Sequence, residues 1–139
     1  MAVPLIESGY QNKPARKNKY KAAGIWQFIP ETAINFGLNV DDKKANGRDA
    51  AVAQDQRLDL NMSTDAALNY IWTNQIRFHD WLLALAAYNM GENNLKNAID
   101  KMGTDDVWKL IRAGYEGDKA YIAKLEAAIL IMKNPNSLN

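Results

Sequence analysis

Apolar residues recur every three or four positions along most of this chain, whereas β-branched residues rarely cluster or alternate. This spacing matches one face of an α-helix and differs from the two-residue repeat of a β-strand. The sequence therefore predicts an all-α protein. With 139 residues, of which 47% are hydrophobic, the chain is long enough for one core but too short for two. We expect a single globular domain over residues 1–139.

Glycine, proline and capping residues mark where the expected helices begin and end. Short helices are expected over 4–8, before Gly9, and from Pro30 to Gly37. The clearest helix follows Ser63 and Thr64, and its predicted inner face carries Leu68, Ile71, Trp72, Gln75 and Ile76. The remaining expected helices are 80–88, ended by Gly91; 95–102, ended by Gly103; a short one capped by Thr104 and ended by Gly114; and one from about 118 toward Asn134. Because 80–88 is apolar nearly all round, we expect it to be the central core helix.

Charge and composition exclude several classes of protein. Lys and Arg number 17 against 16 Asp and Glu, so the net charge is +1. This is far from the basic excess of nucleic-acid-binding domains, and we expect no nucleic-acid partner. The chain has no cysteine and one histidine, His79. Disulfides, thiolate chemistry and Cys-ligated zinc are therefore excluded. We expect neither a metal nor a cofactor.

Nothing in the sequence predicts a membrane segment. No apolar run approaches the roughly 18 residues that a spanning helix needs. The first residues, Met1 to Pro4, contain neither the basic region nor the apolar stretch of a secretory signal. We therefore expect neither a membrane span nor an export signal within this chain.

Glu7 is the candidate general acid. It lies in the last turn of the short expected helix, between Ile6 and Ser8-Gly9. The negative end of a helix and apolar neighbours both disfavour ionisation, so we expect the pKa of Glu7 to be raised toward the protonated form that an acid catalyst needs. Placement alone favours the opposite interpretation, a solvated glutamate. The motifs around Glu7 decide between the two.

Five segments stand in a recognisable order. They are Pro4 to Tyr10, Ala22 to Ala33 with the run Gly24-Ile25-Trp26-Gln27, Phe36 to Leu38, Asp55 to Asp59 followed by Ser63-Thr64, and Asp80 to Glu92 with Ala87-Tyr88-Asn89. A sixth, Tyr121-Ile122, opens the last helix. In order and approximate spacing these segments resemble the lytic transglycosylases of glycoside hydrolase family 23, which have a goose-lysozyme-like fold. Within that family the motifs are most similar to those of the membrane-bound type D branch.

The resemblance implies a function. Family members cleave the bond between N-acetylmuramic acid and N-acetylglucosamine in peptidoglycan and leave a 1,6-anhydro end, without a cofactor. Glu7 corresponds to the single catalytic glutamate, which acts first as acid and then as base. Tyr121 would hydrogen-bond Glu7, and Ser8, Gln27 and Asn89 would contact the substrate.

Two aromatic residues of these motifs have structural interpretations as well. Aromatic side chains in apolar helices usually belong to the core. We therefore place Trp26 in the core, whereas groove wall and core are equally good interpretations of Tyr88.

Two other functions stay open on the sequence. A goose-type muramidase would use water and a second carboxylate, for which the candidates are Asp41, Asp42, Asp49, Asp55 and Asp59. A non-catalytic wall-binding module is disfavoured by the presence of Glu7, Gln27, Tyr88, Asn89 and Tyr121 together.

The resemblance also implies a binding partner and a cellular location. The partner would be the glycan strand of peptidoglycan, and the chain is expected to be a monomer. Its substrate lies outside the bacterial cytoplasm, so we expect an exported protein of the periplasm or cell envelope, or a part of a phage or secretion machine. A basic run, Lys13, Arg16, Lys17, Lys19 and Lys21, is better interpreted as a solvated loop than as a site for anionic wall polymers.

Overall fold

The computed structural model describes residues 1–15, 20–40, 55–115, 118 and 120–138. Their regular secondary structure is helical, apart from one isolated antiparallel bridge between Ala23 and Phe28. The all-α prediction is therefore confirmed. Most of the basic run, and the carboxylates Asp41, Asp42 and Asp49, lie outside the described residues.

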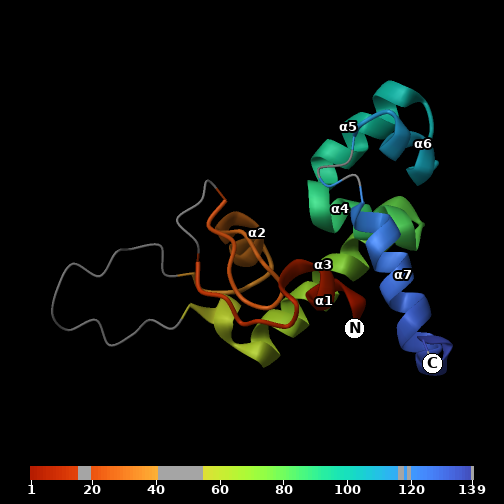
Figure 1. Cartoon of the computed structure of the whole chain (residues 1–139). Coiled ribbons are helices and arrows are strands. Elements are labelled where there is room, and N and C mark those ends of the chain that lie inside the picture. Colours follow the sequence, from red (N-terminus) through yellow and green to blue (C-terminus); the bar gives the residue numbers. More distant parts are fainter. Residues whose placement is uncertain (16–19, 41–54, 116–117, 119, 139) are drawn as a thin grey trace, which may run out of the picture. The chain divides into compact units, whose positions relative to one another are not determined.

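The chain forms two compact units. The first comprises residues 3–69 with Met1, and the second residues 70–139 with Ala2. Four elements begin in the first half of the chain: α1 (Ala2–Ser8), α2 (Pro30–Asn35), the 3-10 helix η1 (Gln56–Leu58) and α3 (Leu60–Phe78), which continues into the second unit. The others are α4 (Trp81–Met90), α5 (Glu92–Met102), α6 (Val107–Arg112), α7 (Tyr121–Lys133) and the 3-10 helix η2 (Pro135–Leu138) (Figure 1). That residues 1–139 form one domain stays a prediction.

Helix ends follow local signals in the sequence. Gly9 ends α1 in the left-handed conformation, with φ of 63°, and Pro30 is the first residue of α2. Asp59 caps α3, because its Oδ1 accepts hydrogen bonds from the backbone N–H groups of Asn61 and Met62, both at 2.9 Å. The helix therefore begins at Leu60, ahead of the expected start after Ser63.

The predicted inner face of α3 is partly wrong, because only Ile71 of its five residues is buried. Leu68, Trp72 and Ile76 are 46%, 54% and 53% exposed. Besides Ile71, the buried residues of this helix are Ser63, Ala66, Ala67, Tyr70 and Asn74. Three of the buried residues, Ser63, Ala66 and Ala67, have small side chains that allow neighbouring segments to approach the helix closely, so side-chain shape as well as hydrophobicity decides which residues are buried.

The second unit is built around α4, as predicted. Leu83, Ala84, Ala86 and Ala87 are buried, and α4 packs against α5, α6 and α7 (Figure 1). Neighbouring helices bury residues against this core: Leu95 and Ala98 of α5, Val107 and Leu110 of α6, and Ile122 and Leu125 of α7. A core of this kind fixes the end of α4, where Tyr88 and Asn89 lie.

Aspartate caps open two helices of the second unit. Asp80 accepts a hydrogen bond from the backbone N–H of Leu83 at 2.9 Å at the start of α4. The cap of α6 is Asp106, whose Oδ1 accepts from Trp108 and Lys109 at 3.0 and 3.1 Å, so the expected cap, Thr104, was wrong. Backbone donation, chiefly by Lys109, holds the pKa of Asp106 below its ordinary value.

Within the described residues, no helix combines the length and the apolar character that crossing a membrane requires.

Candidate functional site

Glu7 lies in the last turn of α1, as the sequence predicts. The backbone N–H of Gly9 donates to the carbonyl of Leu5 at 3.0 Å, and that of Tyr10 to the carbonyl of Pro4 at 3.2 Å. These bonds fix the end of the helix, while the side chain of Glu7 is half-buried. The carboxyl group is therefore held on an ordered turn beside the partial negative charge of the helix end.

Ser8 ties this helix to the segment that carries Gln27. Its buried hydroxyl donates to the carbonyl of Ile25 at 2.8 Å, and the carbonyl of Pro4 lies 3.0 Å from the same oxygen. A hydroxyl has one proton to donate, so Ser8 can offer a substrate only its lone pairs. Because Ser8 follows Glu7 and bonds to Ile25, these hydrogen bonds hold the turn that leads to Gln27 close to the end of α1.

Gln27 closes a tight turn. Its backbone has φ of 51°, and its Nε2 donates to the carbonyl of Gly24 at 2.7 Å. The neighbouring Trp26 is 1% exposed and its indole N–H donates to Oγ1 of Thr64 at 2.9 Å. Trp26 is therefore a core residue, as predicted, and its burial anchors the turn. The side chain of Gln27, on the same turn, is half-buried.

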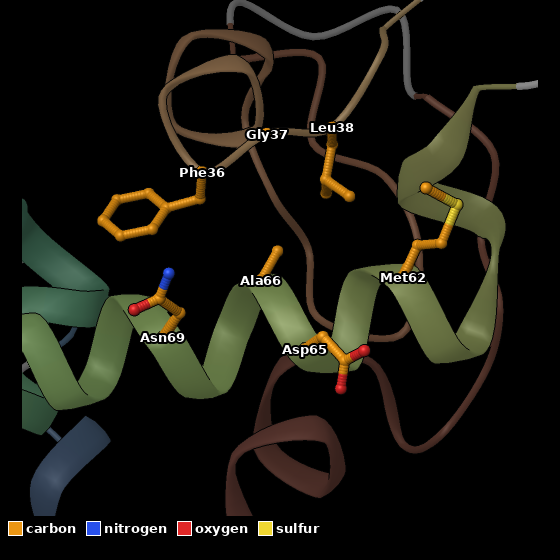
Figure 2. A pocket seen from close by; sticks show the side chains of 7 residues that line it. All are labelled: Phe36, Gly37, Leu38, Met62, Asp65, Ala66 and Asn69. Carbon is orange, nitrogen blue, oxygen red and sulfur yellow. The ribbon is translucent and has the colours of Figure 1, made fainter.

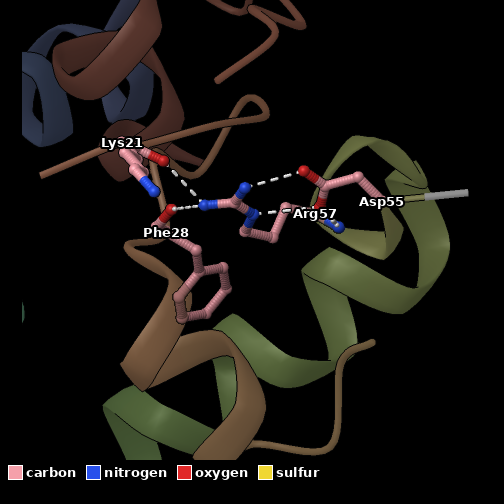
Figure 3. A network of polar contacts seen from close by, with 4 residues as sticks. All are labelled: Lys21, Phe28, Asp55 and Arg57. Atoms are coloured by element: carbon pink, nitrogen blue, oxygen red, sulfur yellow. Dashed lines mark hydrogen bonds and ion pairs between the residues drawn. The ribbon is translucent and has the colours of Figure 1, made fainter. Parts of the chain in front are cut away.

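A buried arginine, Arg57, holds the turn Gly24 to Gln27 through hydrogen bonds to the residues on either side of it. Arg57 is 2% exposed and forms an ion pair with Asp55 in which Nη2 and Oδ2 are 2.7 Å apart and Nε and Oδ1 are 2.9 Å apart (Figure 3). Its Nη1 donates to the carbonyls of Lys21 and Phe28, at 2.7 and 3.1 Å. These two residues flank Gly24 to Gln27, so one guanidinium fixes both ends of the turn.

Gly24 is required by this packing. Its φ is 79°, and a Cβ at this position would lie 1.9 Å from the carbonyl oxygen of Arg57. No side chain fits so close to a backbone oxygen, and the left-handed backbone itself favours glycine. In the sequence, Gly24 and Asp55 to Asp59 stand out only as parts of motifs, and nothing there predicts that Arg57 joins them.

Tyr88 and Asn89 lie at the end of α4. The ring of Tyr88 is half-buried and its centre lies 5.4 Å from that of Tyr70. Tyr70 donates to Oε2 of Glu92 at 2.7 Å, and burial, followed by this contact, raises the pKa of its hydroxyl. Among the described residues, Oδ1 of Asn89 is buried and has no hydrogen-bond partner. A buried amide oxygen of this kind suits a ligand that donates a hydrogen bond.

Tyr121 is the first residue of α7. It is 2% exposed, and its backbone N–H donates to the carbonyl of Asp118 at 2.8 Å. The site residues thus fall into two groups: Glu7, Ser8 and Gln27 belong to the first unit, and Tyr88, Asn89 and Tyr121 to the second.

Two of the carboxylates that are candidates for a second catalytic role already interact with other groups of the protein. Asp55 is paired with Arg57, and Asp59 caps α3. In the part of the chain that the structure describes, no group of three or more His, Asp or Glu residues is arranged to hold a metal ion.

Comparison with known proteins places the chain in a family. The model of the transglycosylase SLT domain matches residues 1–111. Two similar proteins are the membrane-bound lytic murein transglycosylases D of Escherichia coli K12 and of E. coli O6:H1. Each is 36% identical to this chain over 137 residues, which is 95% of this chain and 27% of the relative.

A putative tributyltin chloride resistance protein of Alteromonas sp. (strain M-1) is 36% identical over 101 residues, covering 72% of this chain and 43% of that protein. The chain thus spans about a quarter of the length of the murein transglycosylases it matches. The family predicted from the motifs and its lysozyme-like all-α fold class are confirmed. This chain belongs to the transglycosylase SLT domain family.

Proposed function

We propose that this chain is a peptidoglycan lytic transglycosylase. It cleaves the β-1,4 bond between N-acetylmuramic acid and N-acetylglucosamine and leaves a 1,6-anhydro-N-acetylmuramic acid end. Family membership and the similar murein transglycosylases support the activity. The observation that carries the assignment of the catalyst is the position of Glu7, in the last turn of a helix that Ser8 ties to the Gln27 turn.

Glu7 serves both steps of the reaction. Its protonated carboxyl donates a proton to the glycosidic oxygen as the bond to the anomeric carbon breaks. The carboxylate that results takes the proton of the muramyl 6-hydroxyl, whose oxygen attacks the anomeric carbon and closes the anhydro ring. Glu7 ends the cycle protonated, so neither water nor a cofactor is consumed.

The other proposed site residues bind or position. Ser8, next to Glu7 in the chain, and Gln27 lie on two segments that the hydrogen bond from Ser8 to Ile25 joins, which lowers the cost of ordering them around a sugar. The buried Oδ1 of Asn89 supports a role in accepting a hydrogen bond from the substrate. Tyr88 is proposed to line the same groove, and Tyr121 to hold Glu7.

A hydrolytic muramidase is the second candidate, and the two candidate carboxylates that the structure describes, Asp55 and Asp59, weigh against it. A second carboxylate would have to hold a water against the sugar ring. Asp55 is instead committed to Arg57, and Asp59 to the N-terminus of α3. An internal nucleophile needs only Glu7.

The setting of the reaction is proposed from the substrate. Peptidoglycan lies outside the cytoplasm, so the protein is proposed to act in the periplasm or cell envelope, with glycan strands as its partner. A monomer suffices, because all the proposed site residues come from one chain.

The product of digestion tests this function. Purified peptidoglycan treated with the protein should yield muropeptides that end in 1,6-anhydro-N-acetylmuramic acid. Such ends are lighter than hydrolysed ends by one water and resist reduction by borohydride, so mass spectrometry before and after reduction distinguishes them. Predominantly reducible products would replace the transglycosylase by the muramidase.

Replacing Tyr121 by phenylalanine tests its positioning role. The ring still fills the core, whereas the lost hydroxyl no longer orients Glu7, so the rate should fall by a factor that corresponds to about 1–3 kcal/mol. Wall clearing and thermal melting are measured on the same preparation. An unchanged rate, or a loss of stability that accounts for the loss of rate, would leave Tyr121 with a structural role only.

A further inference from the structure

A shallow pocket opens between α2 and α3, inside the first unit. Its volume is about 260 Å³. Figure 2 shows the side chains that line it: Phe36, Gly37 and Leu38 from the turn after α2, and Met62, Asp65, Ala66 and Asn69 from α3. The proposed catalytic residues are not among them, so the pocket has no part in the reaction described above.

The walls of the pocket are ordered by the fold itself. The backbone N–H of Phe36 donates to the carbonyl of Thr32 at 3.1 Å, and that of Leu38 to the carbonyl of Ala33 at 2.9 Å. Leu38 and Ala66 are buried, and the single methyl of Ala66 leaves open the space that a larger residue would fill. A ligand would therefore enter a largely preformed site, which reduces the entropic cost of binding.

The lining combines an aromatic ring with two polar side chains. Asp65 and Asn69 are four residues apart on α3, so they lie on one side of the helix, and both are exposed. The carboxylate accepts hydrogen bonds, while the carboxamide both donates and accepts them. Phe36, half-buried, adds an apolar ring to the same pocket (Figure 2).

The charge of the lining selects among ligands. The seven residues include one carboxylate and no basic side chain, so a phosphate or carboxylate group would be repelled. A lone ammonium group would gain little, because an exposed ion pair contributes about 0–1 kcal/mol. A neutral ring with one apolar face and several hydroxyl groups suits this lining, because the face can pack on Phe36 while the hydroxyls reach the exposed side chains of Asp65 and Asn69 at the rim.

We infer that this pocket binds a neutral N-acetylated amino-sugar ring, as a glycan contact separate from the Glu7 site. Asn69 would pair with the acetamido group. In peptidoglycan the matching residue is N-acetylglucosamine, since N-acetylmuramic acid carries a lactyl group that bears the stem peptide with its carboxylates. The identity of the sugar rests on the proposed function, whereas the preference for a neutral sugar rests on the pocket alone.

A titration followed by nuclear magnetic resonance tests the inference. The folded Glu7→Gln protein is labelled with ¹⁵N and titrated with N-acetylglucosamine and with its β-1,4-linked disaccharide, so that no cleavage complicates binding. Backbone amide shifts should concentrate on Phe36, Gly37, Ala66 and Asn69. Asp65→Ala and Phe36→Ala, made in the same background, should each weaken binding at these amides by about fivefold or more.

Matched controls keep the outcome specific. Ile34→Ala and Asn61→Ala replace exposed residues of α2 and α3 that do not line the pocket, and they should leave the affinity unchanged. Absence of shifts at the pocket, or unchanged affinity in folded Asp65→Ala and Phe36→Ala proteins, overturns the inference. Tighter binding of methylammonium than of the sugar overturns it too.

The two proposals fail separately. If the unmodified protein clears cell walls and the pocket amides do not respond to sugar, the pocket inference falls and the proposed function stands. If the pocket binds sugar but the protein releases no muropeptides, the proposed function falls, and the neutral-sugar site remains.

Discussion

Replacing Glu7 by glutamine is expected to reduce lysis of purified cell walls by at least about 100-fold, the lower end of what a positioned acid or base contributes. The amide keeps the shape of the carboxyl group but has no proton to transfer to the leaving oxygen, and it cannot take one from the 6-hydroxyl. Because Glu7 is only half-buried and lies near the end of α1, folding should change little. Turbidity loss of a wall suspension and thermal melting measure the two effects.

Glu31 provides the matched control for this substitution. It is an exposed glutamate in the first turn of α2, so Glu31→Gln makes the same chemical change away from the proposed site. Its lysis rate should equal that of the unmodified protein. Substantial clearing by a correctly folded Glu7→Gln protein would remove Glu7 from the role of catalyst and leave the activity to another group.

Local chemistry made most helix positions predictable. Gly9 ends α1 and Pro30 begins α2, because a left-handed backbone and a fixed φ are properties of these residue types. Caps were harder to assign. Thr104 and Asp106 are both good capping residues, and only the folded geometry shows that Asp106 accepts the first free backbone N–H groups of α6.

The buried face of α3 could not be read from hydrophobicity. Leu68, Trp72 and Ile76 form the more apolar stripe, yet Ala67 and Asn74 lie on the buried side. A buried face predicted from hydrophobicity takes account only of the free energy of moving each side chain out of water, whereas close packing also depends on the shape of the side chain. Tyr70 is another buried residue of this helix that hydrophobicity does not predict. Its hydroxyl needs a hydrogen-bond partner, and that partner is Glu92, 22 positions further along the chain.

The candidate site, like the fold, could be predicted from the sequence only in part. The order of the motifs led to Glu7, Gln27, Tyr88 and Asn89 because their surroundings resemble those of a known family. Neither spacing nor composition pointed to Arg57. Its partners include the carbonyls of Lys21 and Phe28, which are backbone groups distant in sequence and carry no side-chain signal. The sequence shows only that Arg57 follows the motif residue Asp55 by two positions, and its burial appears first in the structure.

Arg57 is where the second large effect is expected. Four hydrogen bonds from its side chain join Asp55 to the carbonyls of Lys21 and Phe28 (Figure 3). Leucine at this position would occupy part of the space, but the carbonyls of Lys21 and Phe28 would each lose a donor and the carboxylate of Asp55 would lose its ion pair. Removing one member of a buried ion pair is strongly destabilising for this reason.

We therefore expect Arg57→Leu to lower the free energy of unfolding by about 3–5 kcal/mol, as measured by urea denaturation. Because the same guanidinium holds both ends of the Gln27 turn, any folded fraction should also clear cell walls more slowly. Arg77→Leu is the control. Arg77 is exposed and makes only weak contacts, with Oδ1 of Asn93 at 3.3 Å and with the ring of Phe78, whose centre lies 5.5 Å from Cζ, so its effect should stay within about 0.5 kcal/mol. A loss below about 1 kcal/mol for Arg57→Leu would mean that water replaces the guanidinium, and the turn would then owe its conformation to Gly24 and Trp26 instead.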